Sequence, residues 1–261
     1  MIFAVDIGNS NIVIAIMDDS RNVIEMRRIE TEKQGSLHHF TDEIKNVFEI
    51  EEETILRKIN LCDIEGVALS SVVPEVTENV SKAMELITGK KVLIVKNDIR
   101  TGIKIATDFP DKVGTDLIVD SVAAMMEYGG KIVIFDMGTA TTCSVVDEGT
   151  YLGTIIIPGV AISNEALVKG ASQLPPIEFR APKNLIGKNT IESMQSGIVY
   201  ASAAMVDGLI QRVEVNIHAK VTVIATGGIA GLIVPYCEKK IIYEPDLLLK
   251  GLWYLYYKNV E

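Results

Sequence analysis

Two short segments combine an acidic residue, a glycine and small polar side chains in the same order, each at the end of an apolar run. The first is DIGNSN, from Asp6 to Asn11, and the second is DMGTATT, from Asp136 to Thr142. Glycine lets the backbone of such a turn approach a ligand, and amide and hydroxyl groups can bond to phosphate oxygens. The preceding carboxylate suits a metal ion. Either turn alone is also typical of an ordinary β-turn, but their recurrence predicts two turns that face each other across a cleft and hold one polyphosphate.

A third glycine-rich turn follows an apolar run in VIATGG, which ends at Gly227 and Gly228. Adjacent glycines after a buried strand would let a base or a ribose lie against bare backbone, and a helix that follows would favour nearby anionic groups. A simple strand-to-helix turn is the alternative reading of the same residues. The sequence has no GxxxxGK[ST] loop and no GxGxxG turn, which argues against a P-loop and against a dinucleotide-binding fold.

The elements that must carry these turns repeat along the chain. In the first half, apolar alternation predicts a three-stranded meander over residues 1–31, followed by helix 37–47, strand 66–74, helix 76–86 and strand 91–96. After helix 117–128, the second half shows a second meander over residues 131–159, helices 163–174 and 191–215, strand 221–228 and helix 247–257. This pattern predicts an α/β fold of two tandem halves, residues 1–120 and 121–261.

Composition and charge limit the function further. The net charge of −10 and the pI near 4.9 argue against a nucleic-acid partner, because phosphate backbones are held mainly by clustered Lys and Arg. No run of 18 apolar residues and no leader-like start is visible, so we expect neither membrane insertion nor export. The widely spaced Cys62, Cys143 and Cys237 are typical of reduced core thiols in a cytoplasmic protein.

The paired acidic turns and the late glycine pair resemble the acetate and sugar kinase, Hsp70 and actin superfamily, and the chain is specifically similar to the type III pantothenate kinases. The resemblance covers essentially the whole length. Besides the three turns, segments that follow the family pattern in order are SSVVP (70–74), GTIIIPG (153–159), GKNT (187–190), MQSGIVY (194–200) and LKGLWYLY (249–256). It implies two RNase H-like halves, each with a mixed five-stranded sheet, and a cleft between them that clasps ATP.

The resemblance also implies a reaction, the ATP-dependent phosphorylation of the primary hydroxyl of pantothenate to 4′-phosphopantothenate, which begins coenzyme A biosynthesis. By this likeness Asp116, in GTDL, is the base near the acceptor hydroxyl, a role that suits a carboxylate. Asp6 would help to place Mg²⁺, and Asp136 would hold an activating monovalent cation, K⁺ or NH₄⁺. The expected ATP-binding residues are Asp6, Gly8, Asn9, Ser10, Asn11, Gly138, Thr139, Thr142, Gly227 and Gly228.

On the acceptor side, the expected substrate-binding residues are Thr107, Gly114, Thr115, Leu117 and Thr190. Two of them depart from the family pattern. Leu117 replaces the arginine that follows the catalytic aspartate, and leucine cannot make the directed hydrogen bonds of a guanidinium. Thr107 stands where the family usually has tyrosine. Lys104 or Lys112 could supply the missing charge, although both are also typical of solvated loop lysines.

These departures leave three functions open at this point. The chain could be a pantothenate kinase, a kinase for a related acceptor, or a catalytically weak nucleotide-binding paralogue with a regulatory role. The resemblance further implies a homodimer whose interface is formed by the helices after PGVAISNEAL. Independently, apolar residues at 160, 162, 166, 167 and 174 form a face that a small second half would leave uncovered, although such a stripe is also typical of core packing.

Overall fold

The computed structural model of the chain describes residues 1–51, 54–56, 58–96 and 98–260. The chain forms two compact units. Unit 1 consists of Met1–Gly102, Phe109–Ala123 and Asp246–Glu261, and unit 2 consists of Ile103–Asp108 and Ala124–Pro245. Compared with the predicted halves, unit 1 thus includes the C-terminal segment and unit 2 includes a short piece that precedes residue 120.

Unit 1 contains an α/β layer built on one mixed sheet, whose strand order is β3-β2-β1-β6-β7. β1 pairs antiparallel with β2 and parallel with β6. The elements of this unit are β1 (Ile2–Ile7), β2 (Asn11–Met17), β3 (Val23–Glu30), α1 (Leu37–Val47), β4 (Thr54–Ile55), β5 (Ile59–Asn60), η1 (Leu61–Asp63), β6 (Gly66–Ser71), α2 (Pro74–Thr88), β7 (Val92–Ile94), η2 (Pro110–Lys112), the start of α3 (Thr115–Tyr128), and α8 (Leu247–Val260).

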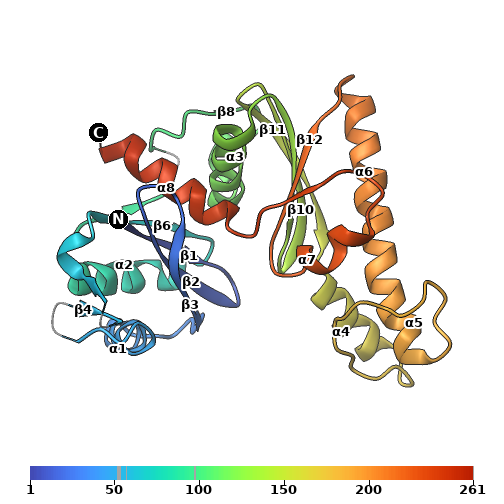
Figure 1. Cartoon of the computed structure of the whole chain (residues 1–261), viewed down its shortest axis with the longest axis horizontal. Coiled ribbons are helices and arrows are strands. Elements are labelled where there is room, and N and C mark those ends of the chain that lie inside the picture. The colour runs from blue at the N-terminus through green and yellow to red at the C-terminus, as the bar shows by residue number, and fades with distance from the viewer. Residues whose placement is uncertain (52–53, 57, 97, 261) are drawn as a thin grey trace. The chain divides into compact units, whose positions relative to one another are not determined.

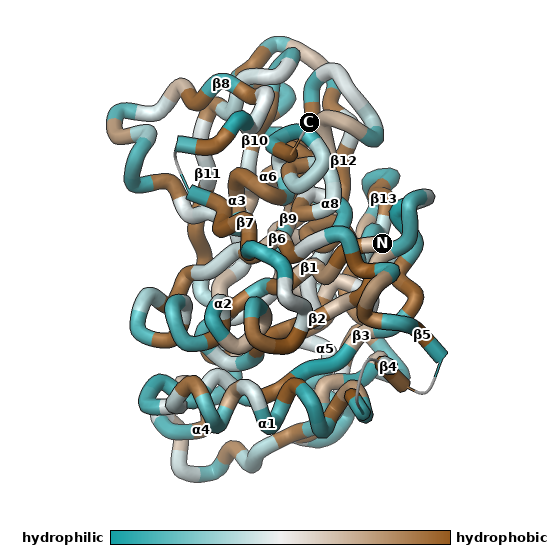
Figure 2. Tube along the Cα trace, turned by 90° about the vertical axis from the view of Figure 1, so that its left-hand side faces the viewer, coloured by the Kyte–Doolittle hydropathy of each residue, from teal (hydrophilic) through white to brown (hydrophobic). Residues whose placement is uncertain are grey.

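The helices of unit 1 begin and end where local chemistry predicts. The Ser36 hydroxyl caps α1 by accepting the His39 N–H at 3.2 Å, and Pro74 opens α2 at a position where no N–H is needed. α2 ends at Gly89, whose φ of 65° is the left-handed conformation typical of a helix C-cap. In Figure 2, brown and teal residues alternate along α1, whose apolar face is buried.

Both faces of the unit 1 sheet are covered. Phe3 and Val5 point to the core beneath α1 and α2, where Phe3 meets the Phe48 ring edge-on at 5.6 Å. Because side chains alternate along a strand, Ile2 and Ala4 face the other side, and α8 contacts β1 and β6. Figure 1 shows α8, in red, beside these blue and teal strands. The last helix of the chain therefore completes the core of the first unit.

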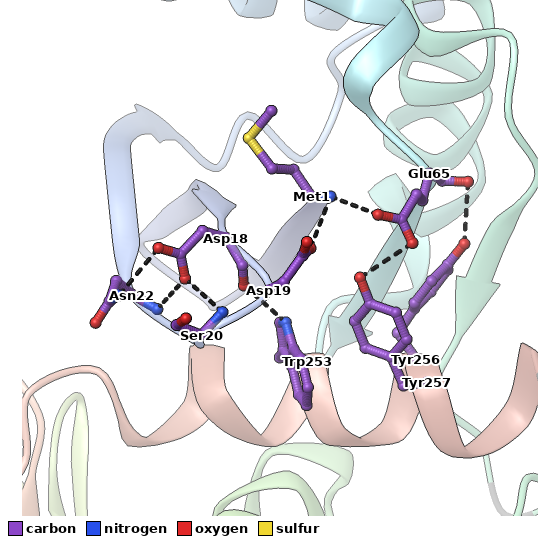
Figure 3. Close-up of polar contacts among 9 residues, drawn as sticks. All are labelled: Met1, Asp18, Asp19, Ser20, Asn22, Glu65, Trp253, Tyr256 and Tyr257. Carbon is purple, nitrogen blue, oxygen red and sulfur yellow. Dashed lines mark hydrogen bonds and ion pairs between the residues drawn. The ribbon is translucent and has the colours of Figure 1, made fainter.

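Polar contacts fix α8 in that place (Figure 3). The Trp253 indole N–H donates to the Asp18 carbonyl at 3.0 Å, the Tyr256 hydroxyl donates to the Glu65 carbonyl at 3.0 Å, and the Tyr257 hydroxyl donates to the Glu65 carboxylate at 3.2 Å. The aromatic residues near the C-terminus are thus structural, which agrees with the packing role expected for apolar residues at helical spacing.

Unit 2 repeats the strand order of unit 1. Its sheet runs β13-β12-β9-β10-β11-β8, so that β11-β10-β9-β12-β13 matches β3-β2-β1-β6-β7 strand for strand. The elements are β8 (Lys104–Ile105), the end of α3, β9 (Lys131–Met137), β10 (Ala140–Asp147), β11 (Thr150–Pro158), α4 (Val160–Gly170), α5 (Thr190–Ser196), a π-helix (Gly197–Ala201), α6 (Ser202–Asn216), β12 (Thr222–Thr226), α7 (Ala230–Ile233), η4 (Val234–Tyr236) and β13 (Ile242–Tyr243).

The duplicated α/β architecture confirms the predicted fold, with two differences in detail. The second sheet has six strands in the described part of the chain rather than five, because β8 pairs in parallel with the edge of β11. The predicted core position of Cys62 is wrong, since this residue is exposed on η1, whereas Cys143 is buried. None of the helices that the described residues form has the length and apolar character needed to cross a bilayer.

Candidate active site

The first acidic turn lies at the end of β1 in unit 1. Asp6 is opposite Val13 on β2 and opposite Ser70 on β6, so it stands at the junction of an antiparallel and a parallel strand pair. The buried Thr31 holds the turn that follows: its hydroxyl donates to the Gly8 carbonyl at 2.7 Å and its N–H donates to the Ser10 carbonyl at 3.2 Å. The buried Thr31 therefore fixes the backbone of the turn from its interior side.

The side chains of the same turn remain outside the protein core. The exposed positions on it are Asn9, Ser10 and Asn11. The Gly8 N–H donates to the Asn11 carbonyl at 3.0 Å, which closes the hairpin between β1 and β2. A fixed backbone with exposed amide and hydroxyl groups is an arrangement that can receive phosphate oxygens without reorganising first.

A pair of hydroxyl groups connects this strand end to the start of α3. The Thr115 hydroxyl lies 3.2 Å from that of Ser70 and donates to the Ser71 carbonyl at 3.0 Å. Ser70 is the cross-strand neighbour of Asp6, and Thr115 directly precedes Asp116. The fold thus brings the DIGNSN turn and the GTDL segment, whose aspartates are 110 positions apart in sequence, to the ends of the neighbouring strands β1 and β6 in unit 1.

Asp116 occupies a partly buried position in the first turn of α3. Its carboxylate accepts the Leu117 N–H at 2.8 Å. Burial raises the pKa of Asp116 above its usual range, and hydrogen bonds from the backbone N–H groups of Leu117 and of Asp116 itself offset part of that shift. A Cβ atom on Gly114 would lie 2.4 Å from the Asp116 carboxylate oxygen, so the glycine of this motif provides the space that the carboxylate occupies.

Leu117 does not stand in for the family arginine. Its side chain is only 9% exposed and belongs to the packed interior. Of the two lysines considered as substitutes, the Lys112 ammonium lies 4.9 Å from the centre of the Phe109 ring, and Lys104 is on β8 opposite Thr150.

The second acidic turn lies at the equivalent place in unit 2, at the end of β9. Asp136 is opposite Thr142 on β10 and opposite Thr226 on β12. The Gly138 N–H donates to the Ala140 carbonyl at 3.0 Å, two positions on, whereas the Gly8 N–H of unit 1 bonds three positions on, to Asn11. Thr139 is exposed. Both turns therefore join the same pair of antiparallel strands in their unit, but the second turn is one residue shorter.

Glycines from two other segments pack directly against this second turn. A Cβ atom on Gly227, whose φ is 92°, would lie 2.5 Å from a carboxylate oxygen of Asp136. A Cβ atom on Gly159 would lie 2.1 Å from the Thr139 carbonyl. The predicted nucleotide turn at Gly227 and Gly228 and the DMGTATT turn are therefore neighbours within unit 2, and bare backbone is what allows them to be.

Thr190 lies at the start of α5, after the helix cap Asn189, whose side chain accepts the Glu192 N–H at 3.0 Å. It lines a cavity of about 860 Å³ within unit 2, whose other walls include α4 and the π-helix. The Asn164 side-chain oxygen, from α4, is buried without a hydrogen-bond partner in the described structure. The Thr107 hydroxyl, on the loop after β8, is also buried without a hydrogen-bond partner in the described structure. Each is a polar atom that a bound ligand could satisfy.

Within the described residues, no three His, Cys, Asp or Glu side chains gather into a group that could hold a metal ion by themselves. Mg²⁺ bound with a nucleotide typically takes one or two carboxylates and completes its shell with phosphate oxygens and water. Asp6, beside the first turn, fits one such carboxylate, and Asp136, beside the second turn, is the carboxylate expected to hold the monovalent cation. They belong to different units, and the expectation that both turns grip one triphosphate stays a prediction.

Several residues that shape the site were not among the predicted ones: Ser70, Thr31, Gly159 and Asn164. Ser70 and Gly159 lie in segments that the family likeness had already marked, SSVVP and GTIIIPG, so a signal existed for them. Thr31 and Asn164 act through contacts that only the folded chain reveals, a hydrogen bond to the back of a turn and a place in a cavity wall.

Comparison with known proteins adds the family. A family model described as Type III pantothenate kinase matches residues 2–212. The type III pantothenate kinase of Dictyoglomus turgidum is 41% identical over 262 residues, covering 100% of both chains, and that of Bacillus cytotoxicus is 38% identical over 260 residues, covering 99% of this chain and 97% of the relative. Among solved structures, a Sinorhizobium meliloti protein named as a candidate 2-dehydro-3-deoxygalactonokinase gives a TM-score of 0.63 at 12% identity, over 98% of this chain and 96% of that one. This last likeness concerns the fold.

Proposed function

The chain belongs to the type III pantothenate kinase family, and from this premise we propose how its own residues carry out the reaction. The enzyme uses ATP with a divalent metal to phosphorylate pantothenate, which is the first step of coenzyme A biosynthesis. The observation that carries the assignment of residues is the link between Ser70 and Thr115, which connects the strand end beside Asp6 to the helix start that carries Asp116.

On the donor side, the two turns hold the phosphates of ATP. Asn9, Ser10 and Asn11 in unit 1 and Thr139 and Thr142 in unit 2 offer the side-chain hydrogen bonds, and Gly8 and Gly138 let the backbone approach. Asp6 would help to hold Mg²⁺, and Asp136 would hold a monovalent cation, K⁺ or NH₄⁺. Bound Mg²⁺ would neutralise the charge that develops on the transferred phosphoryl group. Gly227 and Gly228 contact the nucleoside, which the place of Gly227 against the Asp136 turn supports.

Asp116 is the general base. It orients the primary hydroxyl of pantothenate and takes its proton as the hydroxyl oxygen bonds to the γ-phosphorus and the bond from that phosphorus to the bridging oxygen breaks. The electron pair leaves with ADP. A carboxylate pKa that burial raises supports this role, because a stronger base accepts the proton more readily.

On the acceptor side, Thr107 and Thr190 bind pantothenate. Two observations support this assignment: the buried Thr107 hydroxyl has no hydrogen-bond partner among the described residues, and a cavity lies beside Thr190. Pantothenate carries hydroxyl, amide and carboxylate groups that can satisfy such atoms. Leu117, by contrast, contributes packing rather than a hydrogen bond at the place of the family arginine, and Gly114 gives room to Asp116.

The enzyme acts as a homodimer through unit 2, in the cytoplasm. No residue of α4 is buried within the described chain, although the helix carries Ile162 and Leu167, which are 46% and 49% exposed. Ile156 on the neighbouring β11 is 69% exposed. Apolar side chains that a monomer leaves uncovered over adjacent elements are typical of a surface that a partner covers.

The function is tested by coupling ADP release to pantothenate. Purified enzyme should turn over only when pantothenate, ATP and Mg²⁺ are all present, and faster in K⁺ or NH₄⁺ than in Na⁺. Asp116→Asn should lose turnover by a factor of about 100 or more, because the base is absent, while its affinity for ATP stays close to that of the wild type. Acceptor-independent ATP hydrolysis, or full activity of Asp116→Asn, would contradict the assignment.

A further inference from the structure

The contact between Ser70 and Thr115 lies next to the reacting groups, and yet both hydroxyls are engaged inside the protein. We propose that Thr115 is a positioning residue for the catalytic base: its side-chain hydroxyl fixes the start of α3 against the end of β6 and thereby sets where the Asp116 carboxylate stands. This inference rests on the proposed function of Asp116 and adds to it a residue that acts through Asp116.

The direction of the hydrogen bonds follows from proton counting. The Thr115 hydroxyl donates its only proton to the Ser71 carbonyl at 3.0 Å. It can then only accept from the Ser70 hydroxyl, which lies 3.2 Å away and is fully buried. A donated and an accepted bond together fix both the place and the rotamer of Thr115, and they use the hydroxyl within the protein.

The hydrogen bonds of Asp116 explain why the contact of Thr115 with β6 matters for its position. In the described part of the chain, its carboxylate accepts hydrogen bonds only from the first turn of its own helix, from the N–H groups of Leu117 and of Asp116 itself. These bonds set the carboxylate relative to the helix but not relative to the sheet. The tie between Thr115 and β6 supplies that second reference, and β6 is the strand that pairs with Asp6.

The neighbouring residue on β6 provides a matched comparison. Ser71 makes the same kind of hydroxyl pair with Thr77, at 2.7 Å, and Thr77 donates to the Val73 carbonyl at 2.8 Å. This pair ties β6 to the first turns of α2, which carry no residue of the proposed reaction. Thr115 and Thr77 therefore differ in what their helix carries rather than in the type of contact.

The test compares Thr115→Val with Thr77→Val, since valine keeps the shape of threonine and removes the hydroxyl. Thr115→Val should lower kcat about 10- to 100-fold, the cost of a base displaced by a fraction of an ångström to an ångström, with the KM for ATP unchanged. Thr115→Ser should restore kcat. Thr77→Val should lower the melting temperature by about as much as Thr115→Val does, but it should keep the wild-type kcat. Wild-type kcat in Thr115→Val, or an equal loss in Thr77→Val, would overturn the positioning role.

Two further measurements separate this inference from the function on which it rests. In an Asp116→Asn background, Thr115→Val should cause no additional loss of kcat, whereas independent, multiplying losses would contradict the coupling. If the wild type shows no turnover with pantothenate, it is the proposed function that fails. In that case carbon NMR titration of the Asp116 carboxyl still tests the anchor: Thr115→Val should shift its titration and Thr115→Ser should not, and an unchanged titration in both would sink the idea.

Discussion

Asp116 is placed where its chemistry and the stability of the fold have opposite requirements. A base that must accept a proton benefits from a raised pKa, but the burial that raises it makes the ionised carboxylate unfavourable in the folded state. Because the folded protein binds this proton more tightly than the unfolded chain does, the contribution of Asp116 to stability is greatest at low pH and declines as the pH rises through the folded-state pKa.

This sign gives a prediction for Asp116→Asn. Asparagine cannot ionise, so the variant should have a higher melting temperature than the wild type at neutral pH, and the difference should shrink as the pH falls toward the ordinary aspartate pKa of about 4. Calorimetry over that range measures it. Asp63→Asn, at an exposed position on η1, controls for the removal of one negative charge from a chain with net charge −10. A variant less stable than the wild type at neutral pH would contradict this account.

The residues of the site were predictable from sequence to the extent that their types carry the chemistry. Asp6, Asp136 and the glycines beside them stand out because strand, carboxylate, glycine and hydroxyl recur in one order. The difference in turn length, with Gly8 bonded to Asn11 and Gly138 bonded to Ala140, is visible only in the structure. Thr115 was predicted as a substrate contact, and only the folded structure reveals that its hydroxyl bonds to Ser70 and Ser71. Pairing between distant strands and helices is not encoded in local spacing.

At the scale of elements, the docking of α8 onto unit 1 depends on two glycines that leave no room for a side chain. A Cβ atom on Gly66 would lie 2.1 Å from the Tyr256 hydroxyl oxygen, and one on Gly251 would lie 2.2 Å from the Val119 carbonyl. The second contact is with backbone, which cannot rotate away. The last helix can therefore approach α3 and β6 only where glycine stands.

Gly251→Ala should destabilise unit 1, since the added methyl group forces α8 away from α3, at a cost of about 1–3 kcal/mol. Gly208→Ala in α6 is the matched control, because a Cβ atom there would meet only the end of the Arg212 side chain, at 3.2 Å. Alanine in a helix interior without such a clash should instead stabilise by about 0.5–1 kcal/mol. Urea titrations measure the free energy of unfolding of both variants. If both variants changed it in the same direction relative to the wild type, the close-packing argument would be refuted.

Apolar periodicity predicted most of the helices and strands. It predicted less well where a helix ends or is interrupted. The predicted helix 37–47 coincides with α1, and its signals, a serine cap and a clean apolar face, are local. The predicted helix 191–215 is instead α5, a π-helix and α6 in sequence. A π-turn rotates the apolar face of the helix by part of a turn. Its position depends on tertiary packing, such as that of the buried Val199, and the spacing of apolar residues does not reveal it.

For the whole molecule, the duplication was predictable because both halves write the same meander, and the shared strand order confirms it. The return of α8 to unit 1 was not, because helical periodicity says which face is apolar but not which sheet it covers. The same limit applies to α4. In the sequence its apolar residues fitted either an uncovered face or core packing, and in the described chain none of the residues of α4 is buried.

A homodimer through α4 leads to a direct test. Wild-type protein should have twice the chain mass of 28.5 kDa by light scattering. Leu167→Asp should yield the single-chain mass, because a charge placed in an apolar interface loses its hydration without gaining a partner. Leu86→Asp is the control, since Leu86 is 67% exposed but lies on α2 of unit 1, and its mass should stay doubled. A single-chain mass for the wild type, or a doubled mass for Leu167→Asp, would show that α4 is not the interface and that its exposed leucine and isoleucine need another explanation.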